Sequence, residues 1–215
     1  MADATTPLMA AIDSNDPAQV RAEIARAGGA EAEVPGGTAL GYAIARDRLA
    51  AVRTLLESGA DPNRRDQDGD TAVTLAVQAY DRNPALLQMV LAAGGDPNTR
   101  RRDGNPVVMR FVADHDLSAI ERMKAAGADL SVNERNGQPL IVTTAFANDW
   151  DVVLKMLELG VDPRRPDIRE GFEFIFRDPR GPLPDSPMFR PKLAVWERLR
   201  AAGIVVPAPE GAAER

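Results

Sequence analysis

The chain has 215 residues, of which 44% are hydrophobic, and a formal net charge of −6. It contains no cysteine, which excludes disulfides, thiolate metal sites and a cysteine nucleophile. No apolar run approaches the roughly 18 residues that a membrane-spanning helix needs, and residues 1–15 lack the basic region and apolar core of a signal peptide. We therefore expect a cytoplasmic protein without a membrane span, or a periplasmic one if a signal was removed before residue 1.

The first predicted elements are two antiparallel helices, over residues 6–14 and 17–27. In the second helix Val20 and Ile24 are four residues apart and fall on one apolar stripe. Residues 30–37 follow as a divergent loop that lacks an Asp-Gly turn.

From residue 36 onward the chain repeats a segment at a step of about 33 residues. Glycines end helical apolar patterns at positions 35, 33 and 33 residues apart: Gly59, Gly94, Gly127 and Gly160. Such a regular step indicates stacked supersecondary units and not one mixed core. We predict a single domain over residues 1–207, with repeats at about 5–35, 36–65, 66–100, 101–133 and 134–166 and a divergent unit at 167–207.

Each part of the repeated segment can be explained by helix capping or turn geometry. The four glycines follow helices, where a residue with positive φ is needed. Asp-Pro pairs then stop the helix and turn the chain, at residues 61–62, 96–97 and 162–163. Tight turns are predicted at Asp68-Gly69, Asp103-Gly104 and Asn136-Gly137. Thr38 and Thr71 stand where an N-cap hydroxyl is needed, whereas Pro106 and Pro139 permit a helix start but remove that cap.

The C-terminal unit departs from this pattern. An aromatic stretch at residues 171–176 takes the place of the first helix, a proline-rich stretch at 178–187 follows, and a helix is predicted over 192–202. Two interpretations of Phe172, Phe174 and Phe176 are open: an exposed binding patch or, as we expect, a cover for the apolar end of the stack. Residues 1–5 are expected to fray, and residues 208–215 to form a disordered tail.

Three motifs carry a resemblance to the ankyrin repeat family. Residues 6–11 (Thr-Pro-Leu-Met-Ala-Ala) and 71–76 (Thr-Ala-Val-Thr-Leu-Ala) are similar to its Thr-Pro-Leu-His-x-Ala signature. Residues 59–63 (Gly-Ala-Asp-Pro-Asn) match its other hallmark. The resemblance covers residues 6–207 and implies an all-α ankyrin-repeat solenoid. It would have about six helix-turn-helix repeats joined by finger-like β-turn loops, and a divergent C-terminal capping repeat.

One part of the family pattern is missing from this sequence. The histidine position of the signature is filled by Gly41, Thr74, Met109 and Val142. The hydrogen-bond network that the family usually builds between repeats at this position is therefore not expected here.

The resemblance implies a function as well as a fold. It implies a non-catalytic, monomeric module without a cofactor, which binds another protein through its finger loops and the concave face of its first helices. The family positions that form this face correspond to Arg65, Gln67, Asp68, Asp70, Gln78, Tyr80, Arg100, Arg102, Asn105, Asp114, Asn133, Arg135, Gln138 and Phe146.

The residues themselves show no catalytic constellation. His115 is the only histidine and lies in a predicted turn between two helices. Without a second histidine or a cysteine it supports neither a metal site nor a general base, and we expect a solvated turn residue. The glycines lie at repeat spacing, so no Gly-rich phosphate loop exists. We predict that the protein is not an enzyme and holds no metal.

Arginines recur in register near the fingers, at residues 64–65, 100–102, 135 and 164–165. In a stack they would form a row at a spacing of about 10 Å. Two interpretations are open: the row steers an acidic partner surface, or it is a solvated edge paired to Asp66, Asp68, Asp103 and Glu134. Nucleic acid is not expected as a partner, because the chain is acidic and no aromatic residues interleave the arginines.

Two narrower functions remain open beside a general binding module. The composition looks bacterial, and the divergent ending resembles bacterial ankyrin proteins that are encoded beside secreted toxins. That resemblance suggests an immunity or antitoxin-like inhibitor. The other alternative is a periplasmic accessory protein of a stress-response enzyme.

Overall fold

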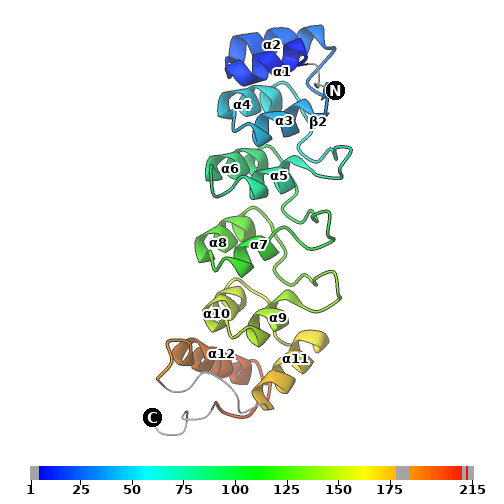
Figure 1. The fold of residues 1–215 in the computed structure, drawn as a ribbon. Helices are drawn as coiled ribbons and strands as arrows, with labels where there is room; N and C mark the ends of the chain where they lie inside the picture. The colour runs from blue at the N-terminus through cyan, green and yellow to red at the C-terminus, as the bar shows by residue number, and fades with distance from the viewer. Residues whose placement is uncertain (1–4, 178–184, 210–211, 213–215) are drawn as a thin grey trace. The chain divides into compact units, whose positions relative to one another are not determined.

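The computed structural model describes residues 5–177, 185–209 and 212 (Figure 1). It divides into two compact units. Unit 1 is Met1–Val107 and unit 2 is Val108–Arg215. The boundary falls inside the fourth predicted repeat, after its finger and before its helices. A single domain over residues 1–207 remains a prediction.

Unit 1 holds three antiparallel helix pairs. They are α1 (Pro7–Ser14) with α2 (Pro17–Arg26), α3 (Ala39–Ala45) with α4 (Leu49–Glu57), and α5 (Ala72–Gln78) with α6 (Pro84–Ala92). The first helices α1, α3 and α5 pack side by side in one layer, and the second helices α2, α4 and α6 in another (Figure 1). Fully buried aliphatic side chains such as Ile12, Ile44, Val52 and Leu55 fill the space between the layers.

The first helices of unit 1 begin at threonine caps, as predicted. The hydroxyl of Thr38 accepts a hydrogen bond from the Gly41 N–H at 3.0 Å, and that of Thr71 accepts from the Thr74 N–H at 3.3 Å. The Thr74 hydroxyl in turn accepts from the Thr71 N–H at 2.9 Å, which closes a capping box. Thr74 occupies the family's histidine position, and these bonds stay within its own repeat.

The first finger contains a β-hairpin, which the all-α prediction did not include. Strand β1 (Glu33–Val34) pairs antiparallel with β2 (Gly37–Thr38). The two residues between them are Pro35 and Gly36, and Gly36 has a φ of 91°. Proline followed by a glycine with positive φ is the sequence of a tight type II turn, so the missing Asp-Gly pair is replaced by another turn.

Unit 2 continues with helix pairs and a different ending. Its helices are α7 (Met109–Ala113), α8 (Leu117–Ala125), α9 (Leu140–Phe146), α10 (Trp150–Glu158), α11 (Pro166–Arg177) and α12 (Phe189–Ala201). Helix α9 packs against α7 and α11, and α10 packs against α9 and α12. The largest fully buried side chains among the described residues of this unit are Trp150, Phe111, Phe172 and Phe189, and each is at most 1% exposed.

Pro106 and Pro139 stand at the predicted cap positions of α7 and α9, where neither helix has a side-chain cap, and α7 is also shortened. Helix α9 follows Pro139 directly and has no side-chain cap bond. Helix α7 begins only at Met109, three residues after Pro106, and has five residues against seven in α9. The predicted loss of the cap is therefore confirmed, and at α7 the first turn is lost as well.

The C-terminal helices are longer than predicted. Helix α11 begins at Pro166, five residues before the aromatic stretch, and α12 begins at Phe189, three residues before the predicted start. Phe172 and Phe176 are buried, whereas Phe174 is 64% exposed. Of the predicted proline-rich stretch, residues 178–184 lie outside the described residues. The same holds for residues 1–4 of the predicted frayed end and for 210–211 and 213–215 of the predicted tail, while Pro209 is buried.

The positive φ values predicted for the repeated glycines are confirmed. Gly59, Gly94, Gly127 and Gly160 have φ between 90° and 97°. Among the described residues, no helix is long and apolar enough to cross a membrane.

Candidate functional site

The fingers are built from short side-chain turns. The carboxylates of Asp61, Asp96 and Asp162 each accept a hydrogen bond from the N–H two residues later, at 2.8 to 2.9 Å. The predicted Asp-Gly and Asn-Gly turns are confirmed, since Gly69, Gly104 and Gly137 have φ of 81°, 81° and 84°. These turns fix the backbone conformation at the fingertips, and therefore the positions from which the fingertip side chains extend.

Arg65 and Arg100 fasten their own fingers. The Arg65 Nη1 donates to the Gly69 carbonyl at 2.5 Å, and the Arg100 Nη1 donates to the Gly104 carbonyl at 2.7 Å. Both side chains also remain exposed to solvent, as do those of Gln67 and Asp68. These residues are accessible on the fingers of unit 1.

Arg102 joins two fingers. Its Nε and Nη2 lie 2.7 and 2.6 Å from the Asp70 Oδ2, and Nη2 lies 3.1 Å from Asp68. Asp70 is 2% exposed and also accepts a bond from the Thr74 hydroxyl at 3.0 Å. The bond to Asp70 is the main cause that raises the pKa of Arg102. Asp70 therefore supports the loop from beneath and does not lie on the accessible surface.

Two other arginines reach back one repeat in the same way. In unit 1 the Arg64 guanidinium contacts Glu31 at 3.0 Å and Glu33 at 2.5 Å. Its pKa is raised, mainly by the hydrogen bond to Glu31. In unit 2 Arg165 donates to the Ser131 carbonyl and, at 2.6 Å, to the Asn133 Oδ1.

An asparagine adds to this finger network. The Asn63 side chain donates to the Gly94 carbonyl at 2.9 Å and accepts from the Asp96 N–H at 2.7 Å. Finger side chains thus hydrogen-bond successive repeats of unit 1.

The sequence-predicted pairing of the arginines is right in part. Asp68 pairs with Arg102, and Asp103 pairs with Arg101. Asp66 instead accepts from the N–H groups of residues 68 and 70. Glu134 accepts from the Thr143 hydroxyl.

The remaining predicted contact residues occupy varied positions. In unit 1, Gln78 is exposed at the end of α5, and Tyr80 and Asn105 are half-buried. In unit 2, Asp114 pairs with Arg110, and the Asn133 amide donates to the Gly137 carbonyl at 2.9 Å. Arg135 and Gln138 are exposed on a finger, and Phe146 is exposed at the end of α9.

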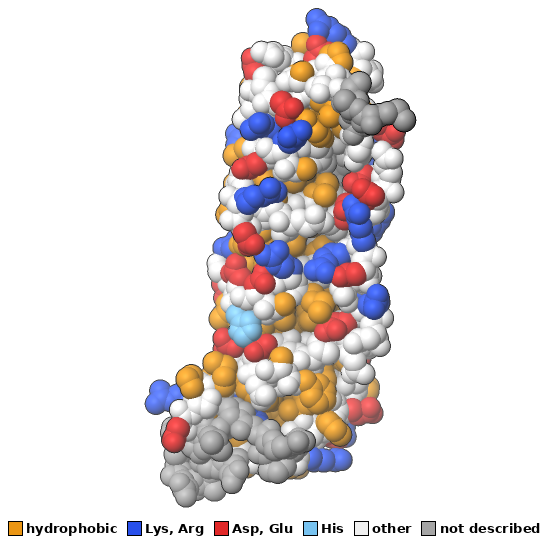
Figure 2. Space-filling view, in the orientation of Figure 1, with side chains coloured by type: hydrophobic (Ala, Val, Ile, Leu, Met, Phe, Trp, Pro, Cys, Tyr) orange, Lys and Arg blue, Asp and Glu red, His pale blue; other side chains and the backbone are white. Residues whose placement is uncertain are grey.

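Phe146 has an aromatic partner that the sequence mapping did not include. Its ring lies 5.9 Å from that of Phe174 on α11, at an interplanar angle of 52°. The two side chains are 53% and 64% exposed. Figure 2 shows hydrophobic side chains gathered over α9 and α11. Phe174 could have been found from sequence, because in a helix Phe172 and Phe176 share one face and the residue between them points elsewhere.

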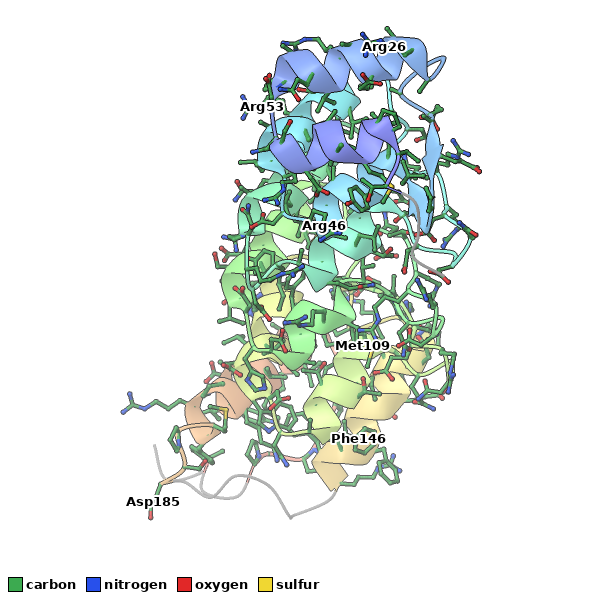
Figure 3. All side chains as sticks on the ribbon, turned by 45° about the horizontal axis from the view of Figure 1, so that its top comes forward. Arg26, Arg46, Arg53, Met109, Phe146 and Asp185 are labelled. Atoms are coloured by element: carbon green, nitrogen blue, oxygen red, sulfur yellow. The ribbon has the colours of Figure 1, made fainter. Side chains whose placement is uncertain are left out.

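A groove of about 330 Å³ lies between α7 and α9 on the same side of unit 2. Its apolar lining comes from Met109, Val112, Ala113, Leu140 and Ala147, and its carboxylates from Glu134 and Asp149. In Figure 3 the labelled Met109 and Phe146 follow each other along this side.

His115 lies beside this groove. Its Nε2 is 3.3 Å from the Asp149 Oδ1, and its side chain is 47% exposed. The predicted turn position is confirmed by a φ of 56°. In the part of the chain that the structure describes, no three His, Asp or Glu side chains form a group able to hold a metal ion.

A second groove, of about 370 Å³, lies between α2 and α4 of unit 1. Pro17, Leu49 and Ala50 form its apolar lining, and Arg21, Arg53 and Glu57 supply charges of both signs. Arg53 projects from α4 (Figure 3).

The comparison with known families agrees with these features. A family model described as ankyrin repeats (many copies) matches residues 40–91, from α3 to α6. No curated protein matches the chain. Paired helices, glycines with positive φ and hydrogen-bonded fingers recur on both sides of the matched segment. Residues 40–91 are therefore ankyrin repeats, and the flanking helix pairs are built in the same way.

Proposed function

We propose that the protein is a non-catalytic module that binds another protein through its fingers and the exposed side of its first helices. Ankyrin repeats generally mediate protein–protein interactions. The observation that carries the proposal is the exposed Phe146–Phe174 pair beside the apolar groove of unit 2. Exposed apolar patches with a polar rim mark interaction sites in soluble proteins.

We propose that the fingers of each unit also contribute accessible contact residues. Arg65, Gln67 and Arg100 in unit 1, and Arg135 and Gln138 in unit 2, present exposed polar side chains. Their hydrogen-bonding groups would fix the orientation of a partner, and the finger arginines suit an acidic patch on it. Asp70 and Arg102 hold the fingers together, so their contribution to binding is indirect.

The proposed module has about six repeats, of which α11 and α12 form the cap. Helix α11 covers α9, and α12 covers α10. The Trp150 and Phe176 rings meet at 5.5 Å, so the ending shields an aromatic side chain of the preceding repeat. A terminal repeat with a covered apolar face is what a solenoid needs to remain monomeric.

The proposal is tested by affinity capture from a lysate of the native organism, followed by direct binding of the purified candidate. The immobilised full chain is compared with the same chain after heat unfolding. We expect a partner that binds only the folded chain, saturably, with calorimetric stoichiometry of about 1:1. Turnover of a substrate that disappears in a single-residue variant with an unchanged melting curve would overturn the non-catalytic assignment.

A further inference from the structure

The Phe146–Phe174 pair is arranged so that an apolar side chain of a partner could pack against it. The two rings already contact each other across α9 and α11, yet more than half of each side chain is exposed. An aromatic side chain has only two side-chain torsions, and mutual contact limits them further. A partner that covers the pair would therefore gain apolar burial at a small cost in conformational entropy.

The adjacent groove is acidic. Glu134 precedes α9 and Asp149 follows it, so the two carboxylates flank a seven-residue helix that is about 10 Å long. Among the described residues that line the groove, none is lysine or arginine.

The neighbouring charged groups are engaged with one another. Arg110 on α7 is paired with Asp114, and Arg169 on α11 is paired with Glu173. His115 faces Asp149, and Glu134 accepts a bond from Thr143. One oxygen of each groove carboxylate takes these bonds, and the second oxygen can accept a donor from a ligand.

We propose that this side of unit 2 binds a segment of a partner protein in which a large apolar or aromatic side chain lies next to lysine or arginine. The inference rests on the proposed protein-binding function and names the chemistry of the partner. The apolar side chain packs on Phe146 and Phe174, and the cation approaches Glu134 and Asp149. A second copy of the chain fits less well, because it brings the same carboxylates and carries a net charge of −6.

The test uses a random dodecapeptide phage library panned on the full chain. We expect the enriched peptides to combine a large apolar side chain with a nearby lysine or arginine. Binding of one synthetic peptide is then measured by fluorescence anisotropy. The double variant Phe146→Ala/Phe174→Ala should weaken it by at least about 30-fold, as loss of an aromatic hot spot does.

The charge variant separates the two parts of the surface. Glu134→Gln/Asp149→Asn should weaken binding by about 10-fold and flatten its salt dependence. Matched controls are Val205→Ala, an exposed apolar residue outside the surface, and Asp185→Asn, an exposed carboxylate outside the groove. Neither control should change the affinity, and all variants should keep the melting curve of the parent.

Several results would overturn the inference. They are a failure to enrich any peptide, peptides without a preference for cations, or affinities that the two double variants leave unchanged. Binders that map to the fingers would leave the protein-binding function standing while removing this site. Self-association of the parent that disappears in the Phe146→Ala/Phe174→Ala variant would assign the surface to a second copy of the chain.

Discussion

At the scale of single residues, the recurrence of arginine in the fingers has a structural cause. Arg64, Arg102 and Arg165 each reach back to the preceding finger, where they contact Glu31, Asp70 and Asn133. The sequence shows the recurrence, but each partner lies more than 30 residues away along the chain. Repeat spacing alone therefore could not distinguish arginines that hold the fingers from arginines that are available to a partner.

Replacing Arg102 with alanine should destabilise the protein more than replacing Arg65. The first change leaves the Asp70 carboxylate, which is 2% exposed, without its cation, and an uncompensated buried charge is costly. The second removes only a bond from an exposed side chain to the Gly69 carbonyl. Thermal melts should show a drop of a few degrees for Arg102→Ala and almost none for Arg65→Ala.

The amide variant of Asp70 provides the control for this prediction. Asp70→Asn in the Arg102→Ala background should recover part of the loss, because a neutral amide is less costly to bury than a carboxylate. Equal melting temperatures for Arg102→Ala and Arg65→Ala would show that the finger contact contributes nothing.

Asp167 should make the stability of the folded protein depend on pH in the acidic range. Arg165 donates to both of its carboxylate oxygens, at 2.7 and 2.9 Å, and this bond is the main cause that lowers the pKa of Asp167 below 3.8. The contribution to stability is thus complete above the unfolded pKa and is lost as pH falls through the lower folded value. Asp167→Asn should melt below the parent at pH 7, and the difference in melting temperature should shrink as pH falls below 3.8. A gap in melting temperature that persists in acid would contradict this assignment.

At the scale of elements, α11 shows what a pattern can and cannot predict. The aromatic stretch was expected to cover the apolar end of the stack, and Phe172 and Phe176 are buried, with exposures of 0% and 5%. A helical period also requires Phe174 to leave that face, and the structure places it against Phe146. The pattern could not predict that Phe174 meets the Phe146 ring on α9, because that contact depends on how the two helices pack.

The packing of α11 on α9 depends on Gly171. A Cβ built at this position would lie 2.6 Å from both methyl carbons of Val142. Gly171→Ala should therefore push α11 away and destabilise the protein by about 1–3 kcal/mol, as overpacking does. Denaturant unfolding measures the change, and Glu170→Ala, an exposed neighbour on the same helix, should be close to neutral.

A second substitution tests the cause of this effect. Val142→Ala removes the methyl carbons that the new Cβ would meet, so the double variant should be more stable than the sum of the two single changes predicts. Simple additivity would mean that the loss does not come from this contact.

At the scale of the whole molecule, the step of about 33 residues was enough to predict helix pairs, their glycine caps and the threonine starts of α3 and α5. It did not predict the β1–β2 hairpin, because the Pro35-Gly36 turn does not use the Asp-Gly chemistry of the other fingers. Nor did it predict the short α7, whose first turn is missing after Pro106. Among the described residues, the hairpin and the short α7 each occur in one repeat only. The repeat spacing predicts only the features that all copies share, so it could not predict either of them.

We expect the C-terminal helices to be necessary for the solubility of unit 2. Trp150 is fully buried, and it contacts Phe176 on α11 while α12 packs along α10. A chain that ends at Pro166 loses both helices and exposes this apolar face to water. We expect it to aggregate or to melt far below the parent, since each large aromatic side chain that loses its cover forfeits about 2–3 kcal/mol of burial. Light scattering coupled to size exclusion and a thermal melt decide the outcome. A monomer that melts with the parent would show that the preceding repeats need no cap, and that α11 and α12 serve only to present Phe174.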